Sequence, residues 1–314
     1  MINLRAEFKR LWAESPVLTV MSLLMVATFL GSVAGIVLDP RIITGMPAWL
    51  KPAKFGISTA IYGLTLAWLY RYIRVWRGLL RAVAWTISIV LILEIAIIDM
   101  QAARGVISHF NNATTLDRAL FGVMGVGIGI LLLASVGVLA ALFKQGFENP
   151  AWGWALRLGM LITVLGSAAG GLMIVPKHDQ LQAMRQGEPV PAIGGHTVGA
   201  PDGGPGLPGV GWSTEHGDLR VSHFLGIHGV QIIPLFAWLF GRRRTSVVLI
   251  AASSYVALFA ILVWQAFRGE SIVAADGLTV AVLLAWLGAT AAAMAIAFMT
   301  RRPSAQAAVR GYSR

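Results

Sequence analysis

Long apolar segments alternate with short polar segments along almost the whole chain. Each apolar segment is about as long as the roughly 20 residues that a helix needs to cross the hydrocarbon core of a bilayer. None has the period-two alternation of a membrane-spanning β-strand. The pattern predicts eight transmembrane helices, over residues 16–38, 54–74, 79–101, 118–143, 153–175, 220–240, 245–267 and 277–300.

The composition favours an all-α, polytopic membrane helix bundle over a soluble domain. Charged residues make up 12% of the 314 residues, whereas a soluble domain carries about 25%. Hydrophobic residues make up 57%, which is more apolar sequence than one water-soluble core can enclose. We therefore predict a single transmembrane domain over residues 1–314, integral to the cell (inner) membrane, whose first partner is the lipid bilayer. The absence of cysteine excludes disulfides and thiolate metal ligands.

Lys and Arg are distributed unevenly between alternate connecting segments. When both termini are placed on one side, the segments on that side hold 15 of the 25 basic residues and the opposite segments hold nine. Cytoplasmic loops are enriched in Lys and Arg, so we predict that both termini are cytoplasmic. Residues 303–314 then form a basic cytoplasmic tail. The same rule explains the net charge of +11, so we predict no nucleic-acid partner.

The segment 176–219 is a long, polar loop on the predicted extracytoplasmic side. Gly and Pro supply 14 of the 26 residues in 186–211, so this part is not expected to form a regular helix or strand. Long loops without secondary structure are usually functional or disordered. This one is either a lid over the outer face or a flexible tether. Residues 178–185 are expected to extend the preceding helix by about two turns.

All six histidines fall at the predicted extracytoplasmic face. His109 follows the third helix, His223 and His228 lie in the first turns of the sixth helix, and the other three lie in the long loop. Imidazole binds haem iron, copper and zinc, so His109, His223 and His228 are the predicted ligands of a haem or a transition metal. His223 and His228 are five residues apart, about 140° around a helix. One ion cannot readily bind both, and a bis-imidazole haem would need histidines from different helices.

The third helix also carries two acids within the predicted membrane span. An acid inside a span is costly and persists only if it is paired, protonated or facing a polar cavity. We predict that Glu94 and Asp99 act as catalytic acid or base groups, or orient a histidine. Arg104 and Arg220 complete this predicted catalytic set at the same helix ends. Lys54 is a further cation near this level, where it either neutralises one of the acids or extends to the headgroups.

These residues are compatible with several classes of function. The first is a haem- or metal-dependent redox enzyme with an outward-facing His/carboxylate site. The alternatives are a proton-coupled transporter with Glu94 as the proton site, a metal-free enzyme that modifies a lipid or small-molecule substrate at headgroup depth, and a non-catalytic accessory subunit. All of the site hypotheses require the outer ends of the third and sixth helices to approach each other.

Two short motifs are interpreted as local features. The tripeptide Ser-His-Phe occurs at 108–110 and at 222–224, and we attribute the repetition to chance or to similar local demands. Because Ser and His are adjacent in the chain, we do not expect a serine nucleophile at either place, and no Gly-x-Ser-x-Gly elbow occurs. Gly125 and Gly129 form a G-x-x-x-G pattern that is typical of close helix packing in membranes.

Overall fold

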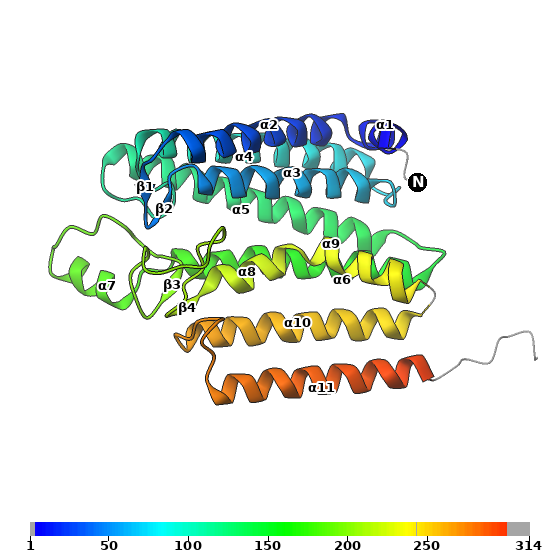
Figure 1. Ribbon diagram of the computed structural model, residues 1–314. Coiled ribbons are helices and arrows are strands. Elements are labelled where there is room, and N and C mark those ends of the chain that lie inside the picture. Colours follow the sequence, from blue (N-terminus) through cyan, green and yellow to red (C-terminus); the bar gives the residue numbers. More distant parts are fainter. Residues whose placement is uncertain (1–3, 243, 300–314) are drawn as a thin grey trace, which may run out of the picture.

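The computed structural model describes residues 4–242 and 244–299, and these are mostly helical. The long helices run side by side, with α1–α5 in one half of the bundle and α6–α11 in the other (Figure 1). Two pairs of very short antiparallel strands, β1 with β2 and β3 with β4, lie in the connecting segments. The bounds are α1 Leu4–Glu14, α2 Pro16–Leu38, β1 Ile42–Ile43, β2 Met46–Pro47, α3 Leu50–Tyr70, α4 Arg77–Arg104, α5 Thr115–Lys144, α6 Pro150–Ala169, α7 His178–Arg185, β3 Thr197–Val198, β4 Gly217–Asp218, α8 Leu219–Ile227, α9 Gly229–Phe236, α10 Thr245–Phe267 and α11 Gly277–Met299.

The all-α class agrees with the prediction. Within the described part of the chain, six helical segments are long and apolar enough to cross a membrane, and the bent pair α8 and α9 makes a seventh if it counts as one span. The predicted second span corresponds to α3, a 21-residue helix that is not among these candidates. The exact number of spans and the side on which the termini lie stay predictions. The tail 303–314 lies outside the described residues.

Polar caps explain where several long helices begin. Ser15, Thr114 and Asn149 stand immediately before α2, α5 and α6, and each side-chain oxygen accepts a hydrogen bond from the backbone N–H three residues further on. This contact satisfies one of the free N–H groups at a helix start. Pro16 and Pro150 follow two of these caps, at a position where proline's missing N–H is not needed.

Two apolar cores hold the bundle together. The larger one is formed by buried residues of α2, α3, α4 and α5, with contributions from α6 and α9. The smaller one lies between α6, α9 and α10. Helices α6 and α9 therefore connect the two halves. Helix α11 packs on α10, and only 6% of its most apolar stretch is buried, so most of its surface faces whatever surrounds the bundle.

Glycines permit close helix contact at α6 and α8, not at the predicted position in α5. A Cβ on Gly166 would lie 2.3 Å from the carbonyl carbon of Gly226, so the two backbones touch there. By contrast, a Cβ on Gly125 or Gly129 would meet nothing within 4 Å. The predicted helix packing through this G-x-x-x-G pattern is wrong, because these glycines face away from the other described helices.

Helices α8 and α9 form one segment that bends by 52° at His228 and Gly229. A break inside a membrane span frees backbone groups that need other partners. Thr163 of α6 supplies them: its hydroxyl accepts from the N–H of Val230 at 2.9 Å and donates to the carbonyl of Ile227 at 3.2 Å. The break is therefore part of the packing between α6 and the bent segment.

The segment 176–219 folds over one end of the bundle, which we call the loop end. It contains α7 and the β3–β4 pair, and these lie opposite the start of α1 and the end of α11 (Figure 1). Helix α7 covers the residues expected to be helical, although the 3-10 turn Gly170–Ile174 separates it from α6. Two-residue strands are the only regular β-structure described in this segment, in keeping with its Gly and Pro content.

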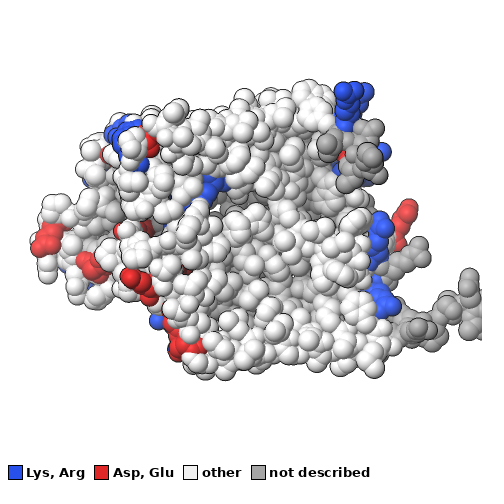
Figure 2. Space-filling model, viewed as in Figure 1, with Lys and Arg blue, Asp and Glu red and all other residues white. Residues whose placement is uncertain are grey.

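Charged residues gather at the two ends of the bundle. In the space-filling view, Lys, Arg, Asp and Glu mark both ends, and a wide band between them is almost free of charge (Figure 2). Large apolar side chains are exposed on this band, including Leu133, Leu284 and Ile296. Such a surface is unfavourable in water and suits the hydrocarbon of a bilayer.

Candidate functional site

A cavity of about 570 Å³ lies beneath the segment 176–219 at the loop end. Its walls come from the first turn of α3, the last turns of α4, the α4–α5 connection and the segment itself. Apolar side chains such as Ile98 and Phe110 alternate with cationic and imidazole groups around it. The volume is sufficient for a small molecule or a lipid headgroup.

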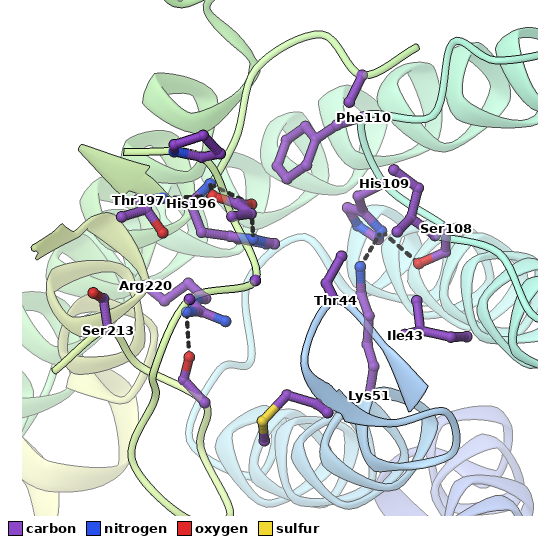
Figure 3. Close-up of a pocket in the computed structure, with 18 of the residues that line it drawn as sticks. Ile43, Thr44, Lys51, Ser108, His109, Phe110, His196, Thr197, Ser213 and Arg220 are labelled. Atoms are coloured by element: carbon purple, nitrogen blue, oxygen red, sulfur yellow. Dashed lines mark hydrogen bonds and ion pairs between the residues drawn. The ribbon is translucent and has the colours of Figure 1, made fainter. Parts of the chain in front are cut away.

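His109 is a cavity residue with polar contacts on both ring nitrogens. Its Nδ1 lies 3.0 Å from Nζ of Lys51 and 3.1 Å from Oγ of Ser108 (Figure 3). Its Nε2 lies 3.4 Å from Oε1 of Glu94. The imidazole is thus held between a carboxylate on one side and an ammonium and a hydroxyl on the other.

These neighbours define the protonation state of the ring. When Lys51 is protonated it can only donate, so Nδ1 of His109 accepts its hydrogen bond and the ring proton is on Nε2, facing Glu94. Burial lowers the pKa of His109 well below its ordinary value, and the nearby positive charge of Lys51 lowers the pKa further. His109 is therefore neutral at physiological pH, and the lone pair of its Nδ1 is directed toward Lys51.

Glu94 is buried behind His109. Its side chain is 3% exposed, and its Oε1 has no hydrogen-bond partner among the described residues. The 3.4 Å contact with His109 is longer than an ordinary hydrogen bond, and catalytic contacts are often loose without substrate. A carboxylate buried this deeply in a membrane span with one weak partner is a candidate functional group.

Aromatic rings surround the other faces of the imidazole. The ring centroids of Phe55, Phe110 and Phe121 lie 5.7, 6.1 and 6.4 Å from that of His109. They come from α3, from the α4–α5 connection and from α5, so three separate parts of the chain position this histidine. These rings also keep water away from the imidazole, which accounts for the lowered pKa.

Asp202 organises the part of the loop that covers the cavity. It accepts hydrogen bonds from the backbone N–H groups of His196 and Thr197, each at 2.9 Å, and lies 2.6 Å from Nδ1 of His196. Burial raises the pKa of Asp202, but its contacts with His196 outweigh this and hold the pKa well below the usual range. Lys177 lies 3.6 Å away. These contacts fix the loop and leave Asp202 ionised.

Arg220 and Lys54 hold the same loop by its main chain. Arg220 forms an ion pair with Asp218 at 2.6 Å and donates to the carbonyl of Gly211, and Nζ of Lys54 donates to the carbonyl of Val210 at 2.8 Å. Arg220, a predicted catalytic residue, therefore lines the cavity at the wall opposite His109 (Figure 3). Lys54 does not pair with either acid of α4.

Two of the predicted ligands lie away from the cavity. Nδ1 of His223 donates to the carbonyl oxygen of Gly166 at 2.7 Å. The ring of His228 packs 4.4 Å from that of Phe224, and its Nε2 has no hydrogen-bond partner among the described residues. Neither histidine is among the described residues that line the cavity.

The remaining predicted catalytic residues lie on α4. Arg104 forms an ion pair with the buried Asp117 at 2.7 Å and also contacts Gln101. Oδ1 of Asp99 is buried and has no hydrogen-bond partner in the described parts of the chain. The cavity wall does not include Arg104 or Asp99.

The described residues contain no group of three or more His, Asp and Glu side chains with the geometry of a metal site. His109, His223 and His228 thus do not form one three-ligand centre. The prediction of a haem or metal centre at these histidines has no support from the geometry. An absorption spectrum and elemental analysis of the purified protein would test it.

The sequence pattern does not indicate Lys51 as a residue of the site. The second helix was expected to begin at residue 54, whereas α3 begins at Leu50. Proline is tolerated in the first turn of a helix, so a start before Pro52 was possible. That start would have placed Lys51 and Lys54 on one helical face.

Comparison of the chain with protein-family models, with curated proteins and with solved structures finds no match.

Proposed function

We propose that this chain is a membrane enzyme that uses His109 as a general base on an amphipathic substrate bound in the cavity. One observation carries the proposal: a neutral imidazole at the cavity wall lies between a buried carboxylate and an ammonium group. In enzymes that use a general base, a neighbouring carboxylate often orients the base, and Glu94 has this position relative to His109.

The proposed chemistry is attack by water, or by a substrate hydroxyl, on an ester. When substrate binds, the Lys51 ammonium turns its hydrogen bond from Nδ1 of His109 to the anionic part of the substrate. The freed Nδ1 takes the proton from the attacking oxygen, which forms its new bond to the ester centre. The bond to the leaving oxygen breaks, and that oxygen receives the proton back from Nδ1. The carboxylate of Glu94 stabilises the imidazolium between these steps, and Lys51 stabilises negative charge on the substrate.

The membrane placement that goes with this proposal is eight spans with the loop end outside. Support comes from the excess of Lys and Arg in the segments on the side of the termini. Helix α3 is the one span added to the seven candidate segments. It packs extensively against α2. Its polar residues are tolerated because one face is covered by protein. The cavity then opens on the extracytoplasmic face.

Product analysis after incubation with membrane lipids tests this function. Purified protein in detergent is mixed with a total lipid extract, and the lipids are measured by mass spectrometry. We expect the wild type to convert at least one amphipathic component, and His109→Gln and Glu94→Gln to lose this conversion. His178→Gln, on the exposed helix α7, is the matched control. Equal conversion by wild type and His109→Gln, or no conversion by the wild type, contradicts the proposal.

A proton-coupled transporter is the second candidate, and the bent pair α8 and α9 favours it. Broken helices near the middle of the membrane are typical of secondary transporters, and buried atoms of His228 and Gln231 lack hydrogen-bond partners in the described chain. Proton uptake into proteoliposomes distinguishes the two candidates. Transport that is lost in Glu94→Gln, without any lipid conversion by the wild type, would favour the transporter.

A further inference from the structure

We infer that the cavity is a binding site for an anionic phosphate group, held by Lys51 and Lys54. This inference deepens the proposed function, on which it rests, by naming the substrate class: an amphiphile with a net-negative phosphate headgroup. The geometry of charges around the cavity carries it.

Of the seven charged side chains described in the cavity wall, three already have partners of opposite charge: Arg220, Lys177 and Asp202. Arg220 is paired with Asp218, and Lys177 lies next to Asp202. Lys51 and Lys54 differ, because neither has a carboxylate within 4 Å in the described parts of the chain; Lys51 contacts His109 and Lys54 contacts a backbone carbonyl. Two partly buried cations therefore have no direct ion pair among the described residues.

The two lysines stand in the first turn of one helix. Lys51 and Lys54 are three residues apart in α3, so they project from the same face, and both line the cavity. Arg220 lines the cavity as well, so a third cationic side chain shares its wall with the two lysines. No side chain caps the start of α3, so its free N–H groups add a partial positive charge at the same place.

The acids in the cavity do not cancel this charge. The His109 ring lies between Glu94 and Lys51. Asp179 and Glu215 also line the cavity, but they are exposed to solvent and pair with neither lysine. The described part of the cavity wall therefore carries four cationic side chains and three acids, and two of these acids are exposed to solvent; the cations are Lys51, Lys54, Lys177 and Arg220, and the acids are Asp179, Asp202 and Glu215.

The depth and shape of the cavity favour a lipid headgroup. It is lined by the first turn of α3 and the last turns of α4, the level at which spans leave the hydrocarbon and phosphates of a bilayer begin. Apolar residues such as Phe55 and Ile98 share its wall with the lysines. Basic atoms are also visible between the two halves of the bundle, next to the band that is otherwise almost free of charge (Figure 2). A phosphorylated amphiphile meets all of these features at once.

Binding without turnover tests this site. The full-length protein is placed in bilayers that mix phosphatidylglycerol with phosphatidylcholine, and the bound lipids are counted by native mass spectrometry. In a second arm, inorganic phosphate is titrated at constant ionic strength, and unfolding is followed by tryptophan fluorescence. The variants are Lys51→Gln, Lys54→Gln and their combination, with Lys144→Gln as the matched control.

We expect preferential binding of phosphatidylglycerol by the wild type and by Lys144→Gln, with about a tenfold or greater loss in Lys51→Gln and Lys54→Gln. Stabilisation by inorganic phosphate with the same dependence on the lysines also supports the site and identifies a soluble source. Equal binding of both lipids without a phosphate effect, or a preference that survives in the double variant, overturns it.

Two further variants keep the test decisive. Lys51→Arg retains the charge, so it should fold and bind if Lys51→Gln fails to fold. His109→Gln separates this inference from the proposed function: it should keep lipid preference while losing conversion. Conversion that depends on His109 without any lipid preference would leave the enzyme proposal standing and reject the phosphate site.

Discussion

Ser-His-Phe at 108–110 and Ser-His-Phe at 222–224 are the same three residues in two different environments. His109 lies at a cavity wall between Glu94 and Lys51, whereas His223 makes a 2.7 Å hydrogen bond to the backbone carbonyl of Gly166. The serines differ too: Ser108 contacts its neighbouring imidazole, and Ser222 donates to a carbonyl of its own helix. The tripeptide alone therefore does not define a role; the partners from other helices do.

The difference has a physical origin in helix position. Ser222 and His223 lie inside α8, where it crosses α6 with backbones in contact, so the imidazole satisfies a carbonyl at a crowded helix crossing. Ser108 and His109 lie in a connection beyond the end of α4, where the chain is free to turn the ring toward α3. The first histidine is thus the proposed base, and the second supports the packing of α8 against α6.

Replacing each histidine by glutamine gives the largest contrast. His109→Gln should lower lipid conversion by a factor of about 100 or more, the usual contribution of a general base, while the unfolding temperature changes little. His223→Gln should retain specific activity in the folded fraction and unfold at a lower temperature. Conversion assays on equal amounts of monodisperse protein measure the first effect. If His223→Gln loses activity at unchanged stability, the assignment of the two roles is reversed.

A second test acts on the helix crossing itself. Gly166→Ala should destabilise the protein by about 1–3 kcal/mol, because its Cβ would overlap the backbone of Gly226. Gly129→Ala is the matched control, since its Cβ meets nothing within 4 Å. Thermal or denaturant unfolding in detergent compares the two. Equal stability of both variants would show that α6 and α8 are not in close contact.

The pH dependence of stability offers a smaller effect. The pKa of His109 lies below 6.5 in the folded protein, so below about pH 6.5 the unfolded chain binds a proton that the folded chain excludes. The free energy of unfolding should therefore fall as the pH drops from about 6.5 toward the lower pKa of the folded His109. Conversion should hold over this window and should fall only when the pH reaches that lower pKa and the base becomes protonated. Lys51, Ser108 and Glu94 are the groups that face this ring. His109→Gln should reduce the decline in stability, although His196, whose pKa is also lowered, retains part of it.

The smallest effect is expected for the second acid of α4. Asp99→Asn should leave conversion within about twofold of the wild type, because Asp99 neither lines the cavity nor contacts His109. Glu94→Gln provides the comparison on the same helix and should lose activity. A large loss in Asp99→Asn would instead extend the site along α4.

Much of the fold is predictable from the sequence, because hydrocarbon imposes long apolar helices. Most of the expected spans correspond to helices of the structure. The apolar pattern does not show where helix ends lie relative to other helices. The start of α3 at Leu50 instead of residue 54 moves Lys51 into the first turn. This earlier start brings Lys51, which the sequence pattern does not indicate, to the site.

The site was only partly predictable for a related reason. Glu94 and His109 stand out as an acid in a span and a histidine at a helix end. Lys51 and His109 are 58 positions apart, and no periodicity in the chain relates them. The orientation of His223 depends on its hydrogen bond to a backbone carbonyl of α6, and every residue has such a carbonyl. Composition and spacing contain no signal for that contact.

The roof of the cavity is fastened by main-chain oxygens. Lys54 and Arg220 donate to the carbonyls of Val210 and Gly211, and any residue at position 210 would offer the same acceptor. Position 211 is more restricted, because its φ of +68° favours glycine. Over evolutionary time, residue 210 is therefore free to diverge among descendants of this chain, while these two main-chain contacts persist as long as the two cations and Gly211 are inherited.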